Sequence, residues 1–440
     1  MSRIEAWKCL RAPGGRNATP LREVDRVAAR EGLDARDRGL LRALVGHEVR
    51  RRATLRALVE HYSRFKPNPD LAAHMRLGLV QVLFLDRIPD HAAVSETVDA
   101  VSRTCGFSKT KYVNAILRAA IRDRQKGASG DPRRDLIGRD LFLAEPVFRD
   151  PEQHPFLWAE DALSVPAPLY KRWSKRFGDE RTRELATYFL AEPPLCLRGV
   201  GIGREELLEA LRGADVPAEP GAHPRTVRVP TASTEAALAS EVFTSGRATV
   251  QGESSLAAAE LVGAQPDESI LDLCAAPGGK TAVMLEAGAR VTAVDDDPGR
   301  LSKLRETLQR LGHVERAQML VSDGTHAVPA GEFDAVLVDA PCSNTGVLGA
   351  RPGARWRFGP QALTELGELQ TRLLREGAER VRPGGRLVWS TCSLEPDENA
   401  QRVRAFLADH PGFELAEERE GLPGVDGPVD GGYAALLHRR

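Results

Sequence analysis

Five short apolar runs follow one another between residues 269 and 391 of the 440-residue chain. Helical stretches of roughly 10–18 residues separate most of them, and this alternation predicts a doubly wound, mostly parallel α/β sheet. In such a sheet, ligands bind outside the carboxyl ends of the strands. Functional residues are therefore expected directly after the five runs, which span residues 269–274, 290–295, 317–323, 333–340 and 386–391.

The N-terminal part of the chain has a different pattern and predicts an all-helical domain. Residues 37–62 place leucines and valines at helical spacing on an arginine-rich background. Residues 72–85 are nearly all apolar, which predicts a helix at the centre of a bundle. Pro89 is expected to end that helix, and Asp90 to cap the next one.

Composition shifts along the chain predict four parts. Residues 1–127 form the all-helical domain, and residues 128–165, rich in proline and glycine, form a linker with short ordered segments. Residues 166–247 form a small α+β unit. Residues 248–440 form the α/β domain.

The charge balance is uneven although the net charge is −1. Residues 1–150 hold 29 Lys and Arg against 19 Asp and Glu, and the remainder holds 32 against 43. A basic module suggests a polyanion partner such as nucleic acid, although solvated arginine-rich helix faces explain the charge equally well.

The six cysteines are scattered, with no CxxC motif and no Cys/His cluster at zinc spacing. This pattern predicts free thiols in a reduced, cytoplasmic protein, and it predicts no metal site.

The segment "LDLCAAPGGKT" (residues 271–281) follows the first run. Pro277, Gly278 and Gly279 make a tight turn that lets backbone N–H groups approach a ligand at a helix N-terminus. The segment is neither a GxGxxG motif nor a phosphate-binding P-loop, because position 274 is cysteine where a P-loop needs glycine. Taken alone, the turn is equally compatible with a purely structural role.

Two aspartates extend this candidate site. Asp295 ends the second run about 20 residues after the glycine turn, where a carboxylate can accept both hydroxyls of a ribose. Asp323 ends the third run, where it either accepts from an adenine amino group or closes a turn. Together these features describe an adenosine site without a triphosphate cradle, the layout of S-adenosylmethionine enzymes.

Two cysteines also follow strand-like runs. Cys342 follows "VLVDAP", and Cys392 follows "LVWST" and precedes a helix start. A thiolate is a strong nucleophile, and one reaction needs both a thiolate and a methyl donor. Addition of sulfur to C6 of an unstacked cytosine activates C5 for methylation; a base then removes the C5 proton and the thiol leaves. Spacing alone does not decide which cysteine attacks.

Three motifs resemble those of the NOL1/NOP2/Sun family of RNA (cytosine-5) methyltransferases. They are "LDLCAAPGGKT", "VDAPCSNTG" and "WSTCSLEPDEN". The segments "RDRGLLRALVGHEVRR", "MRLGLVQVLFLDRIPDHAAVSETV" and "KYVNAILR" resemble the NusB fold, and "SVPAPLYKRW" with "PPLCLRGV" resembles the small RNA-binding unit before the catalytic core. The resemblance covers nearly the whole chain. It implies a Rossmann-like class I methyltransferase domain that acts on RNA, most often small-subunit rRNA in members with the NusB-like module.

The resemblance also implies residue roles. Cys392 would be the nucleophile that adds to C6, and Cys342 would assist product release by helping to break the covalent adduct. Asp339 would contact the cytosine or the methionine end of the cofactor, and Lys280 would lie near both that end and Asp339. S-adenosylmethionine would be held by Cys274, Ala275, Ala276, Pro277, Gly278, Gly279, Lys280, Asp295, Asp323 and Asp339.

The chain departs from the family pattern at several positions that are expected to touch RNA or pack near it. Members of the family commonly carry arginines or an acid after the P-C-S motif, where this chain has small residues. Other positions that differ lie elsewhere in the chain. The positions are Gly199, Val200, Asn344, Gly349, Ala350, Gly353 and Gly432.

Four alternatives remain open from sequence. The roles of Cys342 and Cys392 could be reversed, as in DNA cytosine methyltransferases. The substrate could be tRNA. The chain could be a non-catalytic RNA-binding or ribosome-assembly factor on a methyltransferase scaffold, although both cysteines argue against this. A NusB-like transcription factor would leave more than 300 residues unexplained.

Overall fold

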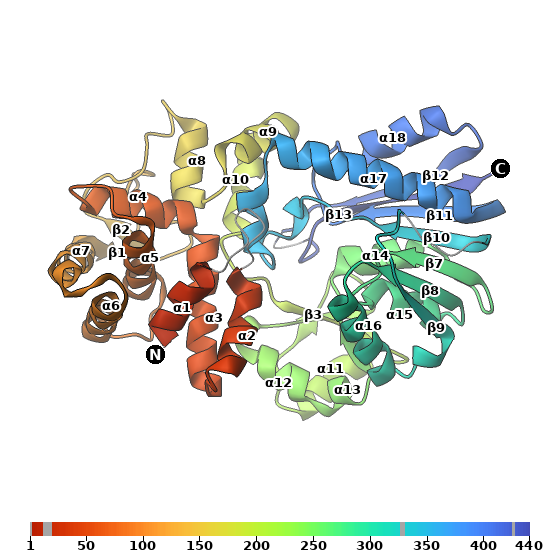
Figure 1. The fold of residues 1–440 in the computed structure, drawn as a ribbon, viewed down its shortest axis with the longest axis horizontal. Coiled ribbons are helices and arrows are strands. Elements are labelled where there is room, and N and C mark those ends of the chain that lie inside the picture. The colour runs from red at the N-terminus through yellow and green to blue at the C-terminus, as the bar shows by residue number, and fades with distance from the viewer. Residues whose placement is uncertain (1, 12–19, 326–330, 425–426) are drawn as a thin grey trace. The chain divides into compact units, whose positions relative to one another are not determined.

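We describe the protein from a computed structural model that covers residues 2–11, 20–325, 331–424 and 427–440 (Figure 1). The chain forms two compact units: residues 1–191 with 351–359, and residues 192–350 with 360–440. This division differs from the four predicted parts, because the main boundary lies at residue 191 and a short later segment returns to the N-terminal unit. Each unit is described by itself.

Helices dominate the N-terminal unit. The apolar helix α5 (Pro69–Phe84) contacts α1, α3, α4, α6 and α7, so the predicted central helix is confirmed. It ends five residues before Pro89, and Asp90 pairs with Arg124 at 2.7 Å instead of capping α6. The other helices here are α1 (Ser2–Leu10), α2 (Pro20–Arg30), α3 (Ala35–Arg50), α4 (Arg52–Tyr62), α6 (Asp90–Cys105), η2 (Phe107–Lys109) and α7 (Thr110–Asp123).

The predicted linker is packed against these helices. It contains the strand β2 (Leu141–Leu143), which pairs antiparallel with β1 (Arg124–Lys126) from just before the linker, and the helix α8 (Pro155–Leu163). Trp158 is buried and donates from Nε1 to the Pro132 carbonyl at 2.9 Å. Two further helices, α9 (Ala167–Phe177) and α10 (Asp179–Tyr188), complete this part of the unit.

Residues 351–359 contain the short helix η6 (Pro352–Arg357), which contacts α3. Arg355 is fully buried, and its guanidinium donates to the carbonyls of Arg50, Ser164 and Phe189 at 3.0–3.3 Å. Trp356 donates to the Val49 carbonyl at 2.7 Å. This segment therefore packs into the N-terminal unit, although more than 160 residues separate it from α10 in sequence.

The second unit is built on a seven-stranded sheet in the order β12-β13-β11-β10-β7-β8-β9. The five strands from β11 to β9 are parallel, which confirms the predicted doubly wound sheet, and β13 runs antiparallel to β11 and β12. The strands are β7 (Ser269–Leu273), β8 (Arg290–Asp295), β9 (Ala317–Val321), β10 (Phe333–Asp339), β11 (Val381–Thr391), β12 (Phe413–Gly421) and β13 (Gly432–Arg439).

Helices cover both faces of this sheet, as Figure 1 shows. Side chains alternate between the two faces along each strand, so Ile270 and Leu271 belong to separate apolar cores. One core is covered by α14 (Glu253–Leu261), α15 (Gly279–Glu286) and α16 (Pro298–Arg310), the other by α17 (Pro360–Arg380) and α18 (Ala400–Asp409).

A smaller four-stranded antiparallel sheet, in the order β4-β5-β3-β6, precedes the large one and has its own apolar core. Its strands are β3 (Leu195–Gly199), β4 (Glu219–Pro220), β5 (Thr226–Val229) and β6 (Ala248–Val250), and its helices are α11 (Arg204–Gly213), α12 (Thr234–Ala239) and α13 (Glu241–Thr244). Across the described ranges of both units, the helices are too short or too polar to span a membrane.

Candidate active site

The predicted site residues follow the carboxyl ends of the parallel strands. Because neighbouring strands are parallel, their ends meet at one edge of the sheet. The strands β7, β8 and β10 end at Leu273, Asp295 and Asp339, and β11 ends at Thr391. The glycine turn, the acids and both cysteines are therefore brought to the same edge.

The glycine turn joins β7 to α15. Gly278 has φ +101°, and a Cβ there would lie 3.0 Å from Cγ of Leu304, so both the backbone and the space favour glycine. The N–H of Ala275 donates to the Val294 carbonyl at 2.9 Å, and the N–H of Ala276 donates to Asp295 at 3.1 Å. These bonds fix the turn to the end of β8.

Asp295 is almost fully buried at the end of β8. It accepts the N–H groups of Ala276 and Asp297 and lies 3.2 Å from Arg300 Nη1. Burial raises the pKa of Asp295, and the charge of Arg300 opposes that rise. The carboxylate is thus already oriented by backbone donors.

Asp323 is exposed and accepts the N–H of Thr325 at 2.8 Å, so it closes a turn, as the structural alternative predicted. Its contact with a cofactor stays a prediction.

Lys280 and Asp339 form an ion pair with 2.7 Å between Nζ and Oδ2. Burial alone would lower the pKa of Lys280, but the nearby Asp339 carboxylate raises it overall. Ser390 donates to the other Asp339 oxygen at 3.2 Å. Helix α15 and the strands β10 and β11 thereby position one charged pair near Cys392.

The two cysteine sulfurs lie 3.3 Å apart. Cys342 is buried, and its pKa is raised well above the usual value, first by the hydrogen bond with Cys392 and then by burial. Either sulfur can donate the hydrogen bond in this contact, so the geometry brings the two thiols together without assigning the nucleophile.

Two contacts of the cysteine loops were missed from sequence. Asn344, noted as a departure, lies with its Oδ1 3.4 Å from the sulfur of Cys392. Glu398 lies in the segment regarded only as a helix start, yet its carboxylate accepts from the serines that follow both cysteines. An acidic residue in the same motif as Cys392 was the one sequence signal that could have identified Glu398 as part of the site.

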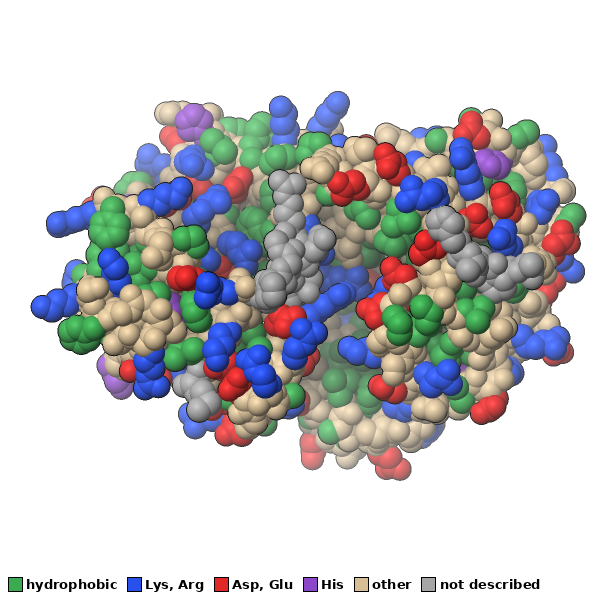
Figure 2. Space-filling model, in the orientation of Figure 1, with side chains coloured by type: hydrophobic (Ala, Val, Ile, Leu, Met, Phe, Trp, Pro, Cys, Tyr) green, Lys and Arg blue, Asp and Glu red, His purple; other side chains and the backbone are tan. Residues whose placement is uncertain are grey.

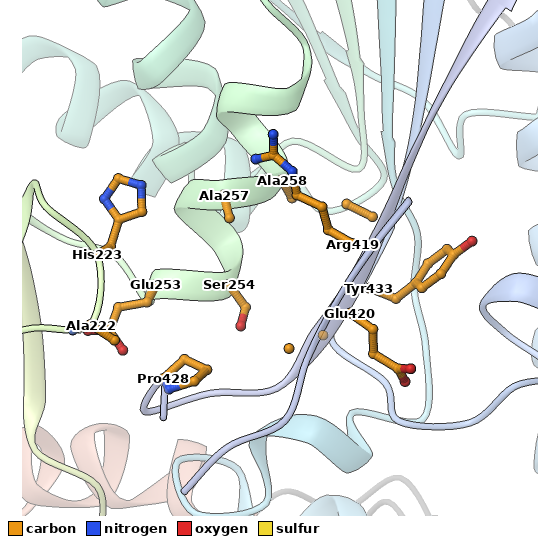
Figure 3. Close-up of a pocket in the computed structure, with 13 residues that line it drawn as sticks. Ala222, His223, Glu253, Ser254, Ala257, Ala258, Arg419, Glu420, Pro428 and Tyr433 are labelled. Carbon is orange, nitrogen blue, oxygen red and sulfur yellow. The ribbon is translucent and has the colours of Figure 1, made fainter. Parts of the chain in front are cut away.

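A pocket of about 270 Å³ lies beside β13, next to the end of β11. Figure 3 shows His223, Ser254 and Pro428 around it, while the ring of Tyr433 points away across the strand. Gly432 also lines it, and a Cβ there would lie 2.7 Å from the Thr391 carbonyl oxygen. The departure at Gly432 therefore has a steric cause in this chain.

One side chain beside the glycine turn has a polar group that suits an adenosine cofactor. A Cβ on Gly279 would lie 3.7 Å from the amide of Gln251, whose Nε2 is buried and has no hydrogen-bond partner within the described chain. A buried donor without a partner beside the glycine turn fits a polar ligand. Among the described residues, no group of His, Cys, Asp or Glu side chains is arranged to hold a metal ion.

Comparisons with known proteins identify the families that this chain resembles. Residues 259–423 match the family model described as 16S rRNA methyltransferase RsmB/F, and residues 5–122 match the NusB family. The Ribosomal RNA small subunit methyltransferase B of Yersinia pseudotuberculosis serotype O:1b (strain IP 31758) and that of Yersinia pestis are each 33% identical over 383 residues, which cover 82% of this chain and 81% of theirs.

Solved structures share the fold. The crystal structure of PH0851 has a TM-score of 0.76 at 23% identity and covers 100% of this chain and 98% of its own. The structure of NSun6 from Pyrococcus horikoshii with SFG has a TM-score of 0.55 at 19% identity and covers 62% of this chain and 98% of its own.

Proposed function

The chain belongs to the 16S rRNA methyltransferase family RsmB/F, and we propose that it transfers a methyl group from S-adenosylmethionine to C5 of one cytosine in 16S rRNA. The observation that carries this proposal is the contact between the Cys342 and Cys392 sulfurs, 3.3 Å apart at the strand edge that holds the glycine turn. A substrate of this kind places the protein in the cytoplasm, the location that we propose.

The cofactor, when bound, supplies the methyl group. The glycine turn, with Gln251 beside it, would hold the cofactor, and Asp295 at the end of β8 would accept hydrogen bonds from its ribose. Asp339, held by Lys280 and Ser390, contacts the cytosine or the methionine end of the cofactor. A rigid ion pair fixes this carboxylate before the substrate arrives.

Cys392 acts as the nucleophile. Its sulfur forms a bond to C6 of the flipped-out cytosine, which makes C5 nucleophilic enough to take the methyl group. Loss of the C5 proton to a base then restores the double bond and breaks the bond to sulfur. Cys342 assists this release. The resemblance of "VDAPCSNTG" and "WSTCSLEPDEN" to the family motifs supports these roles over the reversed assignment.

The N-terminal unit offers a surface suited to RNA. Phe65, 54% exposed, stacks on Tyr112 at 4.5 Å between ring centroids, and Phe107 is 77% exposed. Lys109 and Lys111 are exposed at the adjoining start of α7. In Figure 2, Lys and Arg side chains are spread over this unit. Aromatic rings beside lysines support binding of unpaired bases and phosphates.

The test is to incubate the purified protein with labelled S-adenosylmethionine and, separately, unmodified 16S rRNA, 23S rRNA and bulk tRNA. Label in 16S rRNA alone, mapped to 5-methylcytosine at one site, is the expected result. Label in tRNA alone would favour the tRNA alternative. No label in any pool, with the cofactor bound, would favour the non-catalytic alternative.

A further inference from the structure

Glu398 joins the two loops that carry the cysteines. Each cysteine is followed directly by a serine, and both serines bind this one carboxylate. The hydroxyl groups of Ser343 and Ser393 each donate to Oε2 at 2.5 Å, and the N–H of Ser343 donates to Oε1 at 2.9 Å. A single side chain is therefore bonded next to both sulfurs.

Residues outside the two cysteine loops also donate hydrogen bonds to Glu398. Gln370 on α17 donates to Oε1 of Glu398 and to the carbonyl of Pro341, in both cases at 2.9 Å. The indole of Trp389 on β11 donates to the Glu398 carbonyl at 3.0 Å. Glu398 thus fixes the loop positions relative to the strand and helix that flank them.

Burial of the Glu398 carboxylate costs free energy. Glu398 is 1% exposed, and the four groups that donate to its carboxylate are neutral. Burying a charge costs free energy even when every lone pair is bonded. Packing alone would be served by an apolar residue, which indicates that the acceptor has a specific role.

We propose that Glu398 is a positioning residue that holds the Ser343 and Ser393 loops together and so sets the separation of the Cys342 and Cys392 sulfurs. The proposal rests on the proposed function for the meaning of that separation. Attack by Cys392 and release assisted by Cys342 both require sulfur atoms within reach of one cytosine. Misplacement of a reacting group by about 1 Å costs roughly 100-fold in rate.

The charge of Glu398 has a second effect. Its negative charge adds to the causes that raise the pKa of Cys342, after the hydrogen bond with Cys392 and burial. The same carboxylate therefore favours the protonated form of Cys342.

Loss of the carboxylate should displace the loops without unfolding them. The N–H of Gly346 donates to the Cys392 carbonyl at 3.0 Å, and the N–H of Leu394 donates to Oγ1 of Thr345 at 2.9 Å. These bonds keep the loop backbones joined in a Glu398→Ala variant. In Glu398→Gln, the amide oxygen can replace Oε1 and the NH₂ group can donate to both serine hydroxyls, which accept as well as donate.

The experiment measures sulfur proximity without RNA. Diamide accepts the two hydrogens released when two thiols form a disulfide, and the Cys342–Cys392 link is quantified by peptide mass spectrometry over time. Sulfurs 3.3 Å apart need little movement to reach the bond length of about 2.05 Å. We expect rapid linkage in the wild type and in Glu398→Gln, and linkage at least 10-fold slower in Glu398→Ala.

Glu253→Ala is the matched control. Glu253 is equally buried and accepts from the N–H of Val429 and from Arg228, but it is bonded to neither cysteine loop. Linkage at the wild-type rate in Glu398→Ala, or equal slowing in Glu398→Ala and Glu253→Ala, would overturn the proposal.

Turnover separates this inference from the proposed function. With RNA, kcat should fall by about 100-fold in Glu398→Ala and recover in Glu398→Gln, while the Kd for S-adenosylmethionine is unchanged. Slow linkage in Glu398→Ala alongside a wild type that methylates no RNA would uphold the positioning role and reject the function. Fast linkage in Glu398→Ala alongside normal methylation by the wild type would reject the positioning role and uphold the function.

Discussion

Asp272 is a fully buried acid near the site edge. It lies one residue before the end of β7, and the only hydrogen bond that its carboxyl group makes within the described chain comes from Thr281 at 2.6 Å. Burial raises its pKa to about 7, the hydrogen bond from Thr281 opposes the rise, and Asp339 adds to it. The folded protein therefore holds a proton on Asp272 that the unfolded chain releases near pH 4.

This difference predicts how stability depends on pH. Between about pH 4 and pH 7 the folded state binds more protons at Asp272 than the unfolded state, so its contribution to stability falls as pH rises. Asp272→Asn keeps the acceptor for Thr281 and removes the titration. Its free energy of unfolding, relative to wild type, should increase from pH 4 to pH 8 by at most about 4 kcal/mol. The exposed Asp296→Asn variant controls for the loss of one carboxylate, and parallel curves for Asp272→Asn and wild type would refute the assignment.

Residues 351–359 are the element that most changes the domain organisation. Arg355 carries them into the N-terminal unit by donating to carbonyls from three separate parts of it. Burial lowers its pKa to about 9, and no carboxylate is among these acceptors. Such a guanidinium acts through the fixed geometry of its five donors, which lysine does not reproduce.

Arg355→Met should therefore destabilise the N-terminal unit. It leaves several buried carbonyls without their donor, and the expected loss is about 2 kcal/mol in the free energy of unfolding, measured by denaturant. Arg351→Met, an exposed change in the same segment, should cost much less. Equal free energies of unfolding for both variants would show that the buried Arg355 donors make no net contribution to stability.

Sequence patterns predicted the elements that are marked by their own apolar or glycine residues. The apolar runs marked β7, β8, β9, β10 and β11, and the glycine turn marked the start of α15. The strand β12 was missed because its segment "FELAEEREG" is almost entirely exposed, and pairing with β13 alone makes it a strand. The place of residues 351–359 depends on distant carbonyls that no local pattern encodes.

The same distinction applies to the site. The cysteines, Lys280 and Asp339 stand in recognisable motifs, so both their closeness and their strand ends were predicted. Asn344 and Glu398 act through contacts with residues about 50 positions away, which spacing along the chain does not reveal.

At the scale of the whole molecule, the basic N-terminal unit is proposed to hold RNA for the catalytic unit. Lys109→Ala/Lys111→Ala should weaken binding of 16S rRNA and flatten the dependence of log K on log salt by about 1 per lysine. Phe107→Ala should weaken binding with little change in that slope, because stacking releases no counterions. Lys8→Ala, which removes an ammonium paired with Glu5 at 2.8 Å, is the control. Unchanged affinity and slope in all variants would make this unit structural only.

In the proposed mechanism, Cys392 attacks the cytosine and Cys342 assists release of the product. The most direct measurement is mass spectrometry of the protein–RNA adduct formed by Cys342→Ala with unmodified 16S rRNA and S-adenosylmethionine. We expect an adduct to accumulate in which a methylated cytidine is bonded to Cys392. Cys392→Ala should give no adduct and no product. An adduct trapped on Cys342 in Cys392→Ala would reverse the two roles, and normal methylation by Cys392→Ala would contradict the mechanism.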